Sequence, residues 1–265
     1  MSAFSACLAL VVGTLALVHT VHAASLVTAD YEAPVNRYGH FAAGVPHEYG
    51  RLSVTLSDGG HISLTLDDDQ VFEDVAPRVV RLAPQAPAQI LTIVSHRERG
   101  ARLVVFGLAG TGLQTVAESS AIGTPMRWLN PVDVADLDGD GQAEVVAVVT
   151  PHIAGELRVY RRQGRTLTVV ATLGGVSNHV YGSPELRLGA VASLAGRTGV
   201  LVPDTARKTL RWIGLEHGQL VEWGRCELPA PLIGPLTLVP PSGIHARLST
   251  GPWSAELSRC LGLSR

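Results

Sequence analysis

The feature that most constrains the fold of this chain is an internal repeat of about 50 residues. Four prolines that each precede a short apolar run lie 51 to 54 residues apart: Pro77, Pro131, Pro184 and Pro235. Within each unit, two apolar runs start ten residues apart around a polar or glycine-containing turn, as at Leu103 and Leu113. Repeats of this length, built from short β-like runs without helical periodicity, are typical of propeller blades.

The repeat therefore predicts an all-β fold, namely a small β-propeller with four blades over residues 51–258. Three units are complete and the fourth lacks its outer hairpin, so that the blades cover about residues 72–125, 126–178, 179–229 and 230–250. Five blades follow instead if residues 30–50 or 252–260 contain further strands.

A hairpin near the N-terminus matches the missing part of the last unit. It lies at residues 51–66, where two apolar runs again start ten residues apart, at Leu52 and Ile62. We therefore expect the last blade to be closed by N-terminal strands, because closure removes an open sheet edge. Residues 24–50 are then an N-terminal extension and residues 259–265 a tail.

Residues 1–23 have the pattern of a signal peptide. The stretch from Cys7 to Val18 is apolar and uncharged, and Val21-His22-Ala23 places small residues where signal peptidase accepts them. The alternative is an N-terminal membrane anchor, but a span needs about 20 apolar residues and this apolar run is shorter. We predict export, to the periplasm or out of the cell, with no transmembrane segment after cleavage.

Export would leave two cysteines, Cys226 and Cys260. Two cysteines in an exported protein predict one disulfide, with two buried free thiols as the alternative. The formal net charge of −2 implies no basic face, which argues against a nucleic-acid partner.

An acidic loop at residues 136–144 predicts a calcium site. Its sequence alternates Asp136, Asp138 and Asp140 with glycines that permit tight turns, and Glu144 follows. Hard oxygens converging in a short loop suit Ca²⁺, which accepts several oxygen ligands in flexible geometry, and Gln142 would add its backbone carbonyl. The alternative is an acidic hairpin turn without a metal, since Asp-Gly is ordinary turn chemistry.

An EF-hand does not fit this loop. That motif needs an acidic ligand at loop position 12, which here is Ala147, and it needs flanking helices. The flanks at 132–135 and 145–149 are β-like instead. The acidic loop therefore belongs to a β-hairpin.

The segment from Asp133 to Val146, with its Asp-x-Asp-Gly-Asp-Gly core, resembles the VCBS/FG-GAP repeat of integrin-like β-propellers. The resemblance implies Ca²⁺ in the loop that joins the first two strands of a blade. It implies ligands at Asp136, Asp138, Asp140, Gln142 (backbone) and Glu144. The match is strong in one unit only, because the equivalent turns near 82–89 and 193–198 lack the carboxylates.

Polar and aromatic side chains near the innermost strands are candidates for lining a central channel: Trp128, Asn130, Asn178, His179, Tyr181 and Glu185. The alternative is packing and turn hydrogen bonds. We expect a non-catalytic binding or scaffold propeller whose partner is a protein or carbohydrate ligand. The alternative is a periplasmic hydrolase or lyase with its site in the channel, for which Glu185 and His179 are the acid–base candidates.

Overall fold

The computed structural model describes residues 24–263, and this part of the chain is all-β apart from one short helix, α1 (Leu257–Cys260). The all-β prediction is confirmed. The proposed signal peptide, residues 1–23, lies outside the described residues. No helix in the described range has the length and apolar character needed to cross a membrane.

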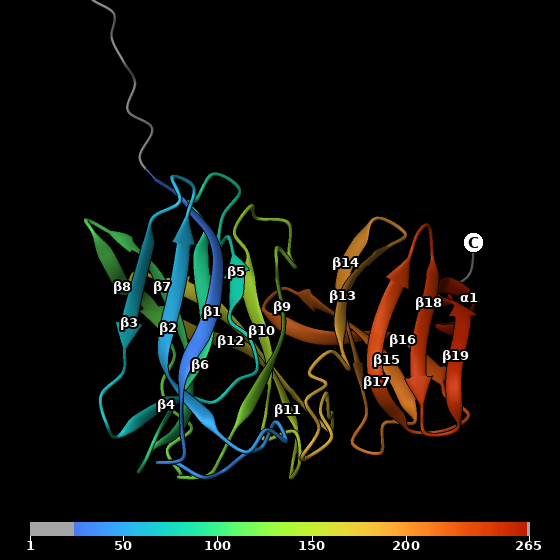
Figure 1. The fold of residues 1–265 in the computed structure, drawn as a ribbon. Helices are drawn as coiled ribbons and strands as arrows, with labels where there is room; N and C mark the ends of the chain where they lie inside the picture. The colour runs from blue at the N-terminus through green and yellow to red at the C-terminus, as the bar shows by residue number, and fades with distance from the viewer. Residues whose placement is uncertain (1–23, 264–265) are drawn as a thin grey trace, which may run out of the picture.

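The strands form three sheets, of 12, four and three strands, and the largest consists of three groups in chain order, which makes five consecutive sheet groups (Figure 1). Group 1 contains β1 (Leu26–Val35), β2 (Glu48–Leu56) and β3 (His61–Thr65). Group 2 contains β4 (Gln70–Phe72), β5 (Arg78–Val80), β6 (Gln89–His96), β7 (Gly100–Ala109) and β8 (Gly112–Glu118). Group 3 contains β9 (Leu129–Ala135), β10 (Glu144–Val149), β11 (Glu156–Gln163) and β12 (Thr166–Gly174).

The last two groups form the smaller, orange-to-red side of the molecule in Figure 1. Group 4 contains β13 (Ala190–Leu194), β14 (Arg197–Pro203), β15 (Thr209–Glu216) and β16 (Gln219–Glu227). Group 5 contains β17 (Leu232–Val239), β18 (Gly243–Leu248) and β19 (Gly251–Glu256). Groups 1 to 3 join into one 12-stranded sheet only through the single residue pairs Tyr49–Phe72 and Glu118–Thr166.

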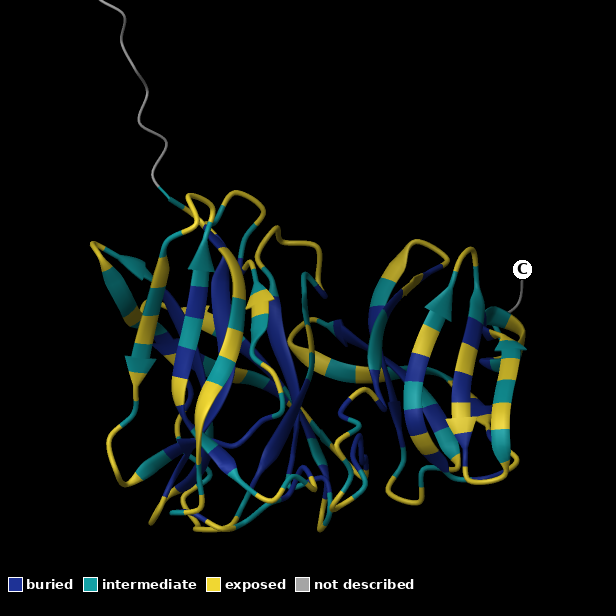
Figure 2. Cartoon of the chain, in the orientation of Figure 1, coloured by how far each residue is buried: buried dark blue, intermediate teal, exposed yellow. Residues whose placement is uncertain are grey.

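Strands in the middle of the groups are buried on both faces (Figure 2). Side chains alternate between faces along a strand, and each face here packs on a different neighbouring group. In β6, Ile90 belongs to the cluster shared with group 1, and Leu91 to the cluster shared with group 3. In β10, Val145 faces group 2 and Val146 faces group 4. This two-sided burial explains why these runs are apolar throughout rather than alternating.

The expected closure of the last sheet by residues 51–66 is wrong. Strand β2 pairs with β1, β3 and β4, all near it in the chain, and the third strand of group 5 is β19. Within residues 24–263, no strand of group 1 pairs with a strand of group 5. The ten-residue spacing identified a hairpin but carries no information on its partner. A neighbour a few residues away is cheaper in chain entropy than one at the far end.

Strand β1 overlaps residues 30–50, and strand β19 overlaps residues 252–260. These are the two ranges in which the five-blade alternative requires further strands.

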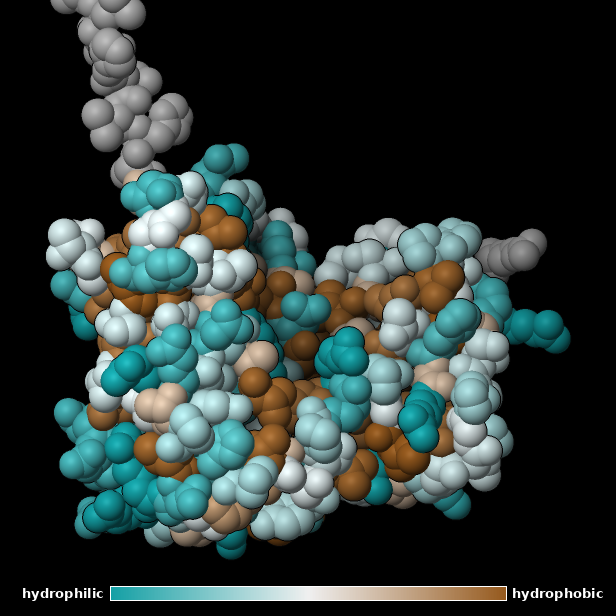
Figure 3. All heavy atoms as spheres, in the orientation of Figure 1, coloured by the Kyte–Doolittle hydropathy of each residue, from teal (hydrophilic) through white to brown (hydrophobic). Residues whose placement is uncertain are grey.

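The sulfurs of Cys226 and Cys260 are bonded, which confirms the predicted disulfide. The bond joins β16 to α1 at the edge of the cluster between groups 4 and 5. Apolar side chains also reach the surface along the junction between the larger and the smaller side of the molecule (Figure 3).

Candidate functional site

The acidic loop joins β9 to β10, the first two strands of group 3. One carboxylate oxygen each from Asp136, Asp138 and Glu144 lie within 4.8 Å of one another. The fold therefore brings together three of the five predicted ligands. Asp140 stands beside this triad, with its Oδ2 3.7 Å from a nitrogen of Arg161.

Backbone amides hold the loop in shape. Gly139 and Gly141 donate their N–H groups to the two oxygens of Asp136, at 2.8 and 2.9 Å. Both glycines have positive φ, of 78° and 86°, a conformation that other residues adopt only with strain. The amide of Leu137 donates to Glu144 Oε2 at 3.0 Å. The loop sequence therefore accounts for the turn, and the turn brings three of the four carboxylates close together.

Sequence reasoning missed Arg161, which lies on β11. Its guanidinium donates to Asp138 Oδ2 and to Glu144 Oε1, both at 2.6 Å. It is absent from the local motif because it follows Glu144 by 17 residues. The signal that finds it is strand register: β10 pairs with β11 at Val145–Tyr160, so Arg161 lies beside Glu144.

The charges of the loop remain unbalanced in spite of Arg161. Four carboxylates against one guanidinium leave three negative charges without a partner in the loop. Glu144 is fully buried, and burial raises the pKa of its carboxyl while the Leu137 amide and Arg161 oppose that shift. The hydrogen bonds to Asp138 and Glu144 raise the pKa of Arg161, which keeps it charged. A divalent cation would neutralise two of these three charges, and carboxylate oxygens are ligands that such a cation accepts.

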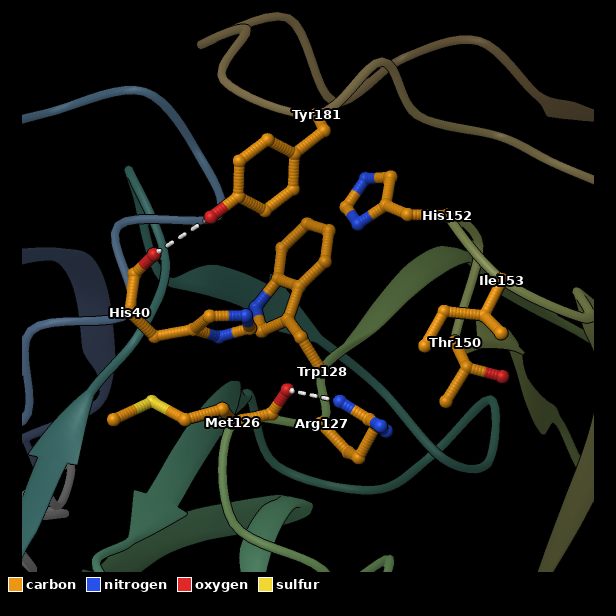
Figure 4. A pocket seen from close by; sticks show the side chains of 8 residues that line it. All are labelled: His40, Met126, Arg127, Trp128, Thr150, His152, Ile153 and Tyr181. Atoms are coloured by element: carbon orange, nitrogen blue, oxygen red, sulfur yellow. Dashed lines mark hydrogen bonds between the residues drawn. The ribbon is translucent and has the colours of Figure 1, made fainter.

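A second site is a pocket of about 150 Å³ at the ends of several strands (Figure 4). His40 reaches it from the β1–β2 loop, and Trp128 from the segment just before β9. His152 comes from the β10–β11 loop and Tyr181 from the β12–β13 loop. Its other lining residues are Met126, Arg127, Thr150 and Ile153. One loop of group 1, one loop of group 3 and the two links before and after group 3 therefore converge here.

Of the predicted channel residues, the structure brings Trp128, His179 and Tyr181 to this pocket or directly behind it. His179 is fully buried, and its ring lies edge-on to Trp128 with centroids 4.8 Å apart. Its Nε2 is 2.8 Å from the carbonyl of Ser183, and its Nδ1 is 2.7 Å from His152 Nε2. A carbonyl only accepts, so His179 carries its proton on Nε2, and its Nδ1 accepts a hydrogen bond from the Nε2–H of His152.

Both histidines are neutral near pH 7. Burial, with a smaller repulsion from His179, lowers the pKa of His152 to about 4. Burial also lowers the pKa of His179 to about 4, with Arg207 contributing. The hydrogen-bond chain then fixes the tautomer of His152, whose N–H is on Nε2 and whose Nδ1 keeps a lone pair.

The remaining predicted channel residues hold the scaffold. Asn130 and Asn178 are fully buried and each donates its amide to the other's backbone carbonyl, at 3.3 and 3.1 Å. Glu185 is bonded to Arg187 through both oxygens. Desolvation opposes the effect of that cation, yet the net shift lowers the pKa of Glu185. For these three, packing and turn hydrogen bonds are the better account.

Sequence reasoning also missed His40 and Glu73. Strands β4 and β5 both pair with β6 and are separated by a short interruption. Glu73 lies in this interruption and is buried. Its Oε1 is 2.6 Å from His40 Nδ1, and Ser95 donates to its other oxygen. Burial raises the pKa of Glu73, and the bond to His40 opposes that shift. No local motif announces this pair, because the partners lie 33 residues apart.

No model of a known protein family matches this chain, and no curated protein matches it.

Proposed function

We propose that the chain is an exported, non-catalytic binding propeller of the VCBS/FG-GAP type, with one structural Ca²⁺ loop. The observation that carries the proposal is the convergence of Asp136, Asp138 and Glu144 in a loop with three unbalanced negative charges. That loop joins the first two strands of a sheet group, the position that the resemblance implies.

The succession of sheet groups supports the propeller proposal. Four apolar clusters lie between neighbouring groups in chain order, as they do between blades stacked around an axis. Because β1 and β19 supply strands at both ends, five blades account for the groups better than four.

Calcium in the loop would be held by Asp136, Asp138 and Glu144, with Asp140 and the Gln142 carbonyl completing the set. The metal would add charge that Arg161 alone does not supply. Binding to the folded state stabilises it by RT ln(1 + [L]/Kd), which is about 2.7 kcal/mol at a hundredfold excess over Kd. The ion is therefore structural in this proposal, and it fixes the β9–β10 hairpin.

The test is thermal unfolding in EDTA, in millimolar Ca²⁺ and in millimolar Mg²⁺. Calcium should raise the Tm and Mg²⁺ should do so poorly, because Mg²⁺ demands a tighter octahedral shell. Asp138→Asn should lose the calcium response, while Asp58→Asn, in the Asp-Gly turn between β2 and β3, should keep it. Identical wild-type melting in EDTA and Ca²⁺ would show an acidic turn without a metal.

The residues that were candidates for catalysis favour binding instead. Both ring nitrogens of His179 are engaged, and Glu185 is committed to Arg187. Neither is positioned to exchange a proton with a ligand. We also propose a periplasmic or secreted location, which the Cys226–Cys260 bond supports, since such bonds persist in oxidising compartments. Mass spectrometry of the mature protein should then find Ala24 as its first residue.

A second candidate function, a hydrolase or lyase, rests on His40 and Glu73. A carboxylate on His40 Nδ1 orients the ring and leaves Nε2 toward the pocket, as in a general-base dyad. Turnover of a polysaccharide or small ester that disappears in His40→Ala would favour this function. The binding function expects no turnover in the wild type.

A further inference from the structure

We infer that the pocket of His40, Trp128, His152 and Tyr181 binds one six-membered aromatic ring that carries a hydroxyl group. The inference deepens the proposed binding function and rests on it. The ligand is a phenol, either a free small molecule or the side chain of a tyrosine in a partner.

The size of the pocket sets the first limit. Sites for drug-sized molecules occupy about 300–1,000 Å³. This pocket measures about 150 Å³, and a cavity of about that volume holds one benzene ring. A single six-membered ring therefore fits, whereas a nucleotide or a disaccharide does not fit inside.

The walls favour an aromatic ring over a sugar. The indole of Trp128 and the ring of His152 are parallel, at 6° with centroids 5.8 Å apart, and Tyr181 stands perpendicular to His152 at 5.2 Å. Figure 4 shows the rings of His40, His152 and Tyr181 grouped around the indole of Trp128. A further ring can meet these groups edge to face, the geometry that aromatic pairs prefer.

The rim is apolar and exposed. Ile153 is 64% exposed, Tyr181 59% and Met126 40%, and all three line the same pocket. Large apolar side chains gathered at one mouth mark a surface that a ligand or partner covers. The rim therefore offers apolar contacts to the part of the ligand or partner to which the aromatic ring is attached.

Two ring nitrogens supply the specificity for a hydroxyl group. His152 Nδ1 has a lone pair and no partner among the described residues, because its other nitrogen donates to His179. His40 Nε2 also has no partner in residues 24–263, because Glu73 takes Nδ1. An acceptor at His152 favours a ligand that donates a hydrogen bond, and it disfavours a carboxylate at that position. The one cation in the lining, Arg127, donates instead to the carbonyl of Met126 at 3.2 Å.

The backbone holds the pocket in one shape. Met126 and Thr150 have positive φ, of 54° and 49°, which is strained for residues other than glycine. Tyr38 accepts the amide of Met126 at 2.9 Å, and Tyr181 donates to the carbonyl of His40 at 3.2 Å. A site that is already ordered loses less conformational entropy when the ligand binds.

The experiment is isothermal titration calorimetry of the full chain in millimolar Ca²⁺ with p-cresol, toluene, cyclohexanol and p-toluate. We expect saturable binding of one p-cresol, and binding of each other compound weaker by at least about tenfold, which is 1.4 kcal/mol. N-acetyl-tyrosinamide separates the two sources: binding as tight as p-cresol indicates a tyrosine of a partner, and exclusion indicates a free phenol.

Variants assign the binding to this pocket. His152→Leu should weaken p-cresol binding about tenfold but spare toluene, and His61→Leu, on exposed β3, should change neither. Tyr181→Ala should weaken both ligands, with Ile233→Ala as the exposed apolar control. In the wild type, the ¹⁵N resonance of His152 Nδ1 should shift with p-cresol and not with toluene. This measurement needs no substitution, so a misfolded variant cannot affect it.

Three results would overturn the inference: no saturation by either phenol, equal affinity for toluene and p-cresol, or binding that survives both pocket variants. These failures are separate from failure of the proposed function. A chain that is stabilised by Ca²⁺ but binds no phenol keeps its calcium loop and loses only this ligand.

Discussion

Arg161 occupies the place beside the acidic loop where a cation is needed. It bridges Asp138 and the buried Glu144, and it lies near Asp140. Without it, the apo loop would hold four carboxylates and no counter-charge. A metal ion bound in the loop would act on the same repulsion as the guanidinium. Removal of one should therefore make the folded protein depend more on the other.

Arg161→Gln should destabilise the metal-free protein by about 1–3 kcal/mol, because the buried Glu144 loses its charged partner. Calcium should then stabilise the variant by more than it stabilises the wild type. Denaturant unfolding in EDTA and in Ca²⁺ measures both effects. Arg162→Gln, whose side chain bonds the carbonyl of Gly164 away from the loop, is the control. Equal calcium stabilisation of wild type and Arg161→Gln would contradict this coupling.

His179 links stability to pH. Its pKa is about 4 in the folded protein and about 6.5 when unfolded, so the unfolded chain binds more protons between these values. Stability should therefore fall as the pH falls from about 6.5 toward 4, by up to about 1.4 kcal/mol per unit for this residue.

The check on this prediction is the difference between wild type and His179→Gln in urea unfolding at a series of pH values. The variant is less stable at pH 7 but should lose less stability on acidification, because its amide does not titrate. His152, whose pKa is also lowered to about 4, contributes a slope of the same sign in both proteins. Glu73 and Glu144 have raised pKa values and contribute the opposite slope in both proteins. Parallel curves for the two proteins would remove His179 as the cause.

At the scale of elements, two loops position the pocket. The β1–β2 loop carries His40, and the β12–β13 loop carries Tyr181. They touch where the Gly182 amide donates to the carbonyl of Ala42 at 3.0 Å. A Cβ on Gly44 would lie 2.1 Å from the Gly182 carbonyl oxygen, so only glycine permits this approach.

Gly44→Ala should force the two loops apart. We expect a loss of about 1–3 kcal/mol of stability, the usual cost of overpacking, and weaker binding in the pocket. Gly39→Ala is a matched control in the same loop, since its φ of 76° is close to the 71° of Gly44 but nothing lies within 4 Å of its Cβ. Denaturant unfolding of both variants separates the steric clash at Gly44 from the backbone strain that positive φ causes at both positions. Equal losses of stability in the two variants would contradict the clash.

At the scale of the whole molecule, the sheet groups form a series with two ends. Group 1 lies at one end and group 5 at the other, and among the described strands neither pairs with the other. In residues 24–263, group 5 has three strands, as group 1 does, and its cluster with group 4 includes Leu257 and Leu261 from the C-terminal segment. The Cys226–Cys260 bond anchors that segment to β16.

Cys260→Ser should lower stability by about 2–4 kcal/mol, the range for removing a disulfide. Calorimetry with and without dithiothreitol measures it: the reductant should lower the Tm of the wild type and leave that of the variant unchanged. An unchanged Tm on reduction of the wild type would show that group 5 does not depend on this anchor.

The sequence by itself determined the local features of the protein. The repeat period and the turn residues predicted an all-β chain and hairpins such as β7–β8. The alternating aspartates predicted that carboxylates come together in the acidic loop. The cysteine count predicted the disulfide. These features depend on alternation, turn chemistry or simple counting, which a few neighbouring residues encode.

Only the tertiary structure decided which distant groups meet. It placed the hairpin of Leu52 and Ile62 beside β1 rather than in the last sheet, and it put Arg161 against Glu144. It also brought His40 into contact with Glu73. Of the candidates for a channel, it placed Trp128 and Tyr181 in the lining of a pocket, and it buried Asn130 and Asn178 in the scaffold. Such contacts depend on strand register and on how sheets stack, and many arrangements share the same local pattern.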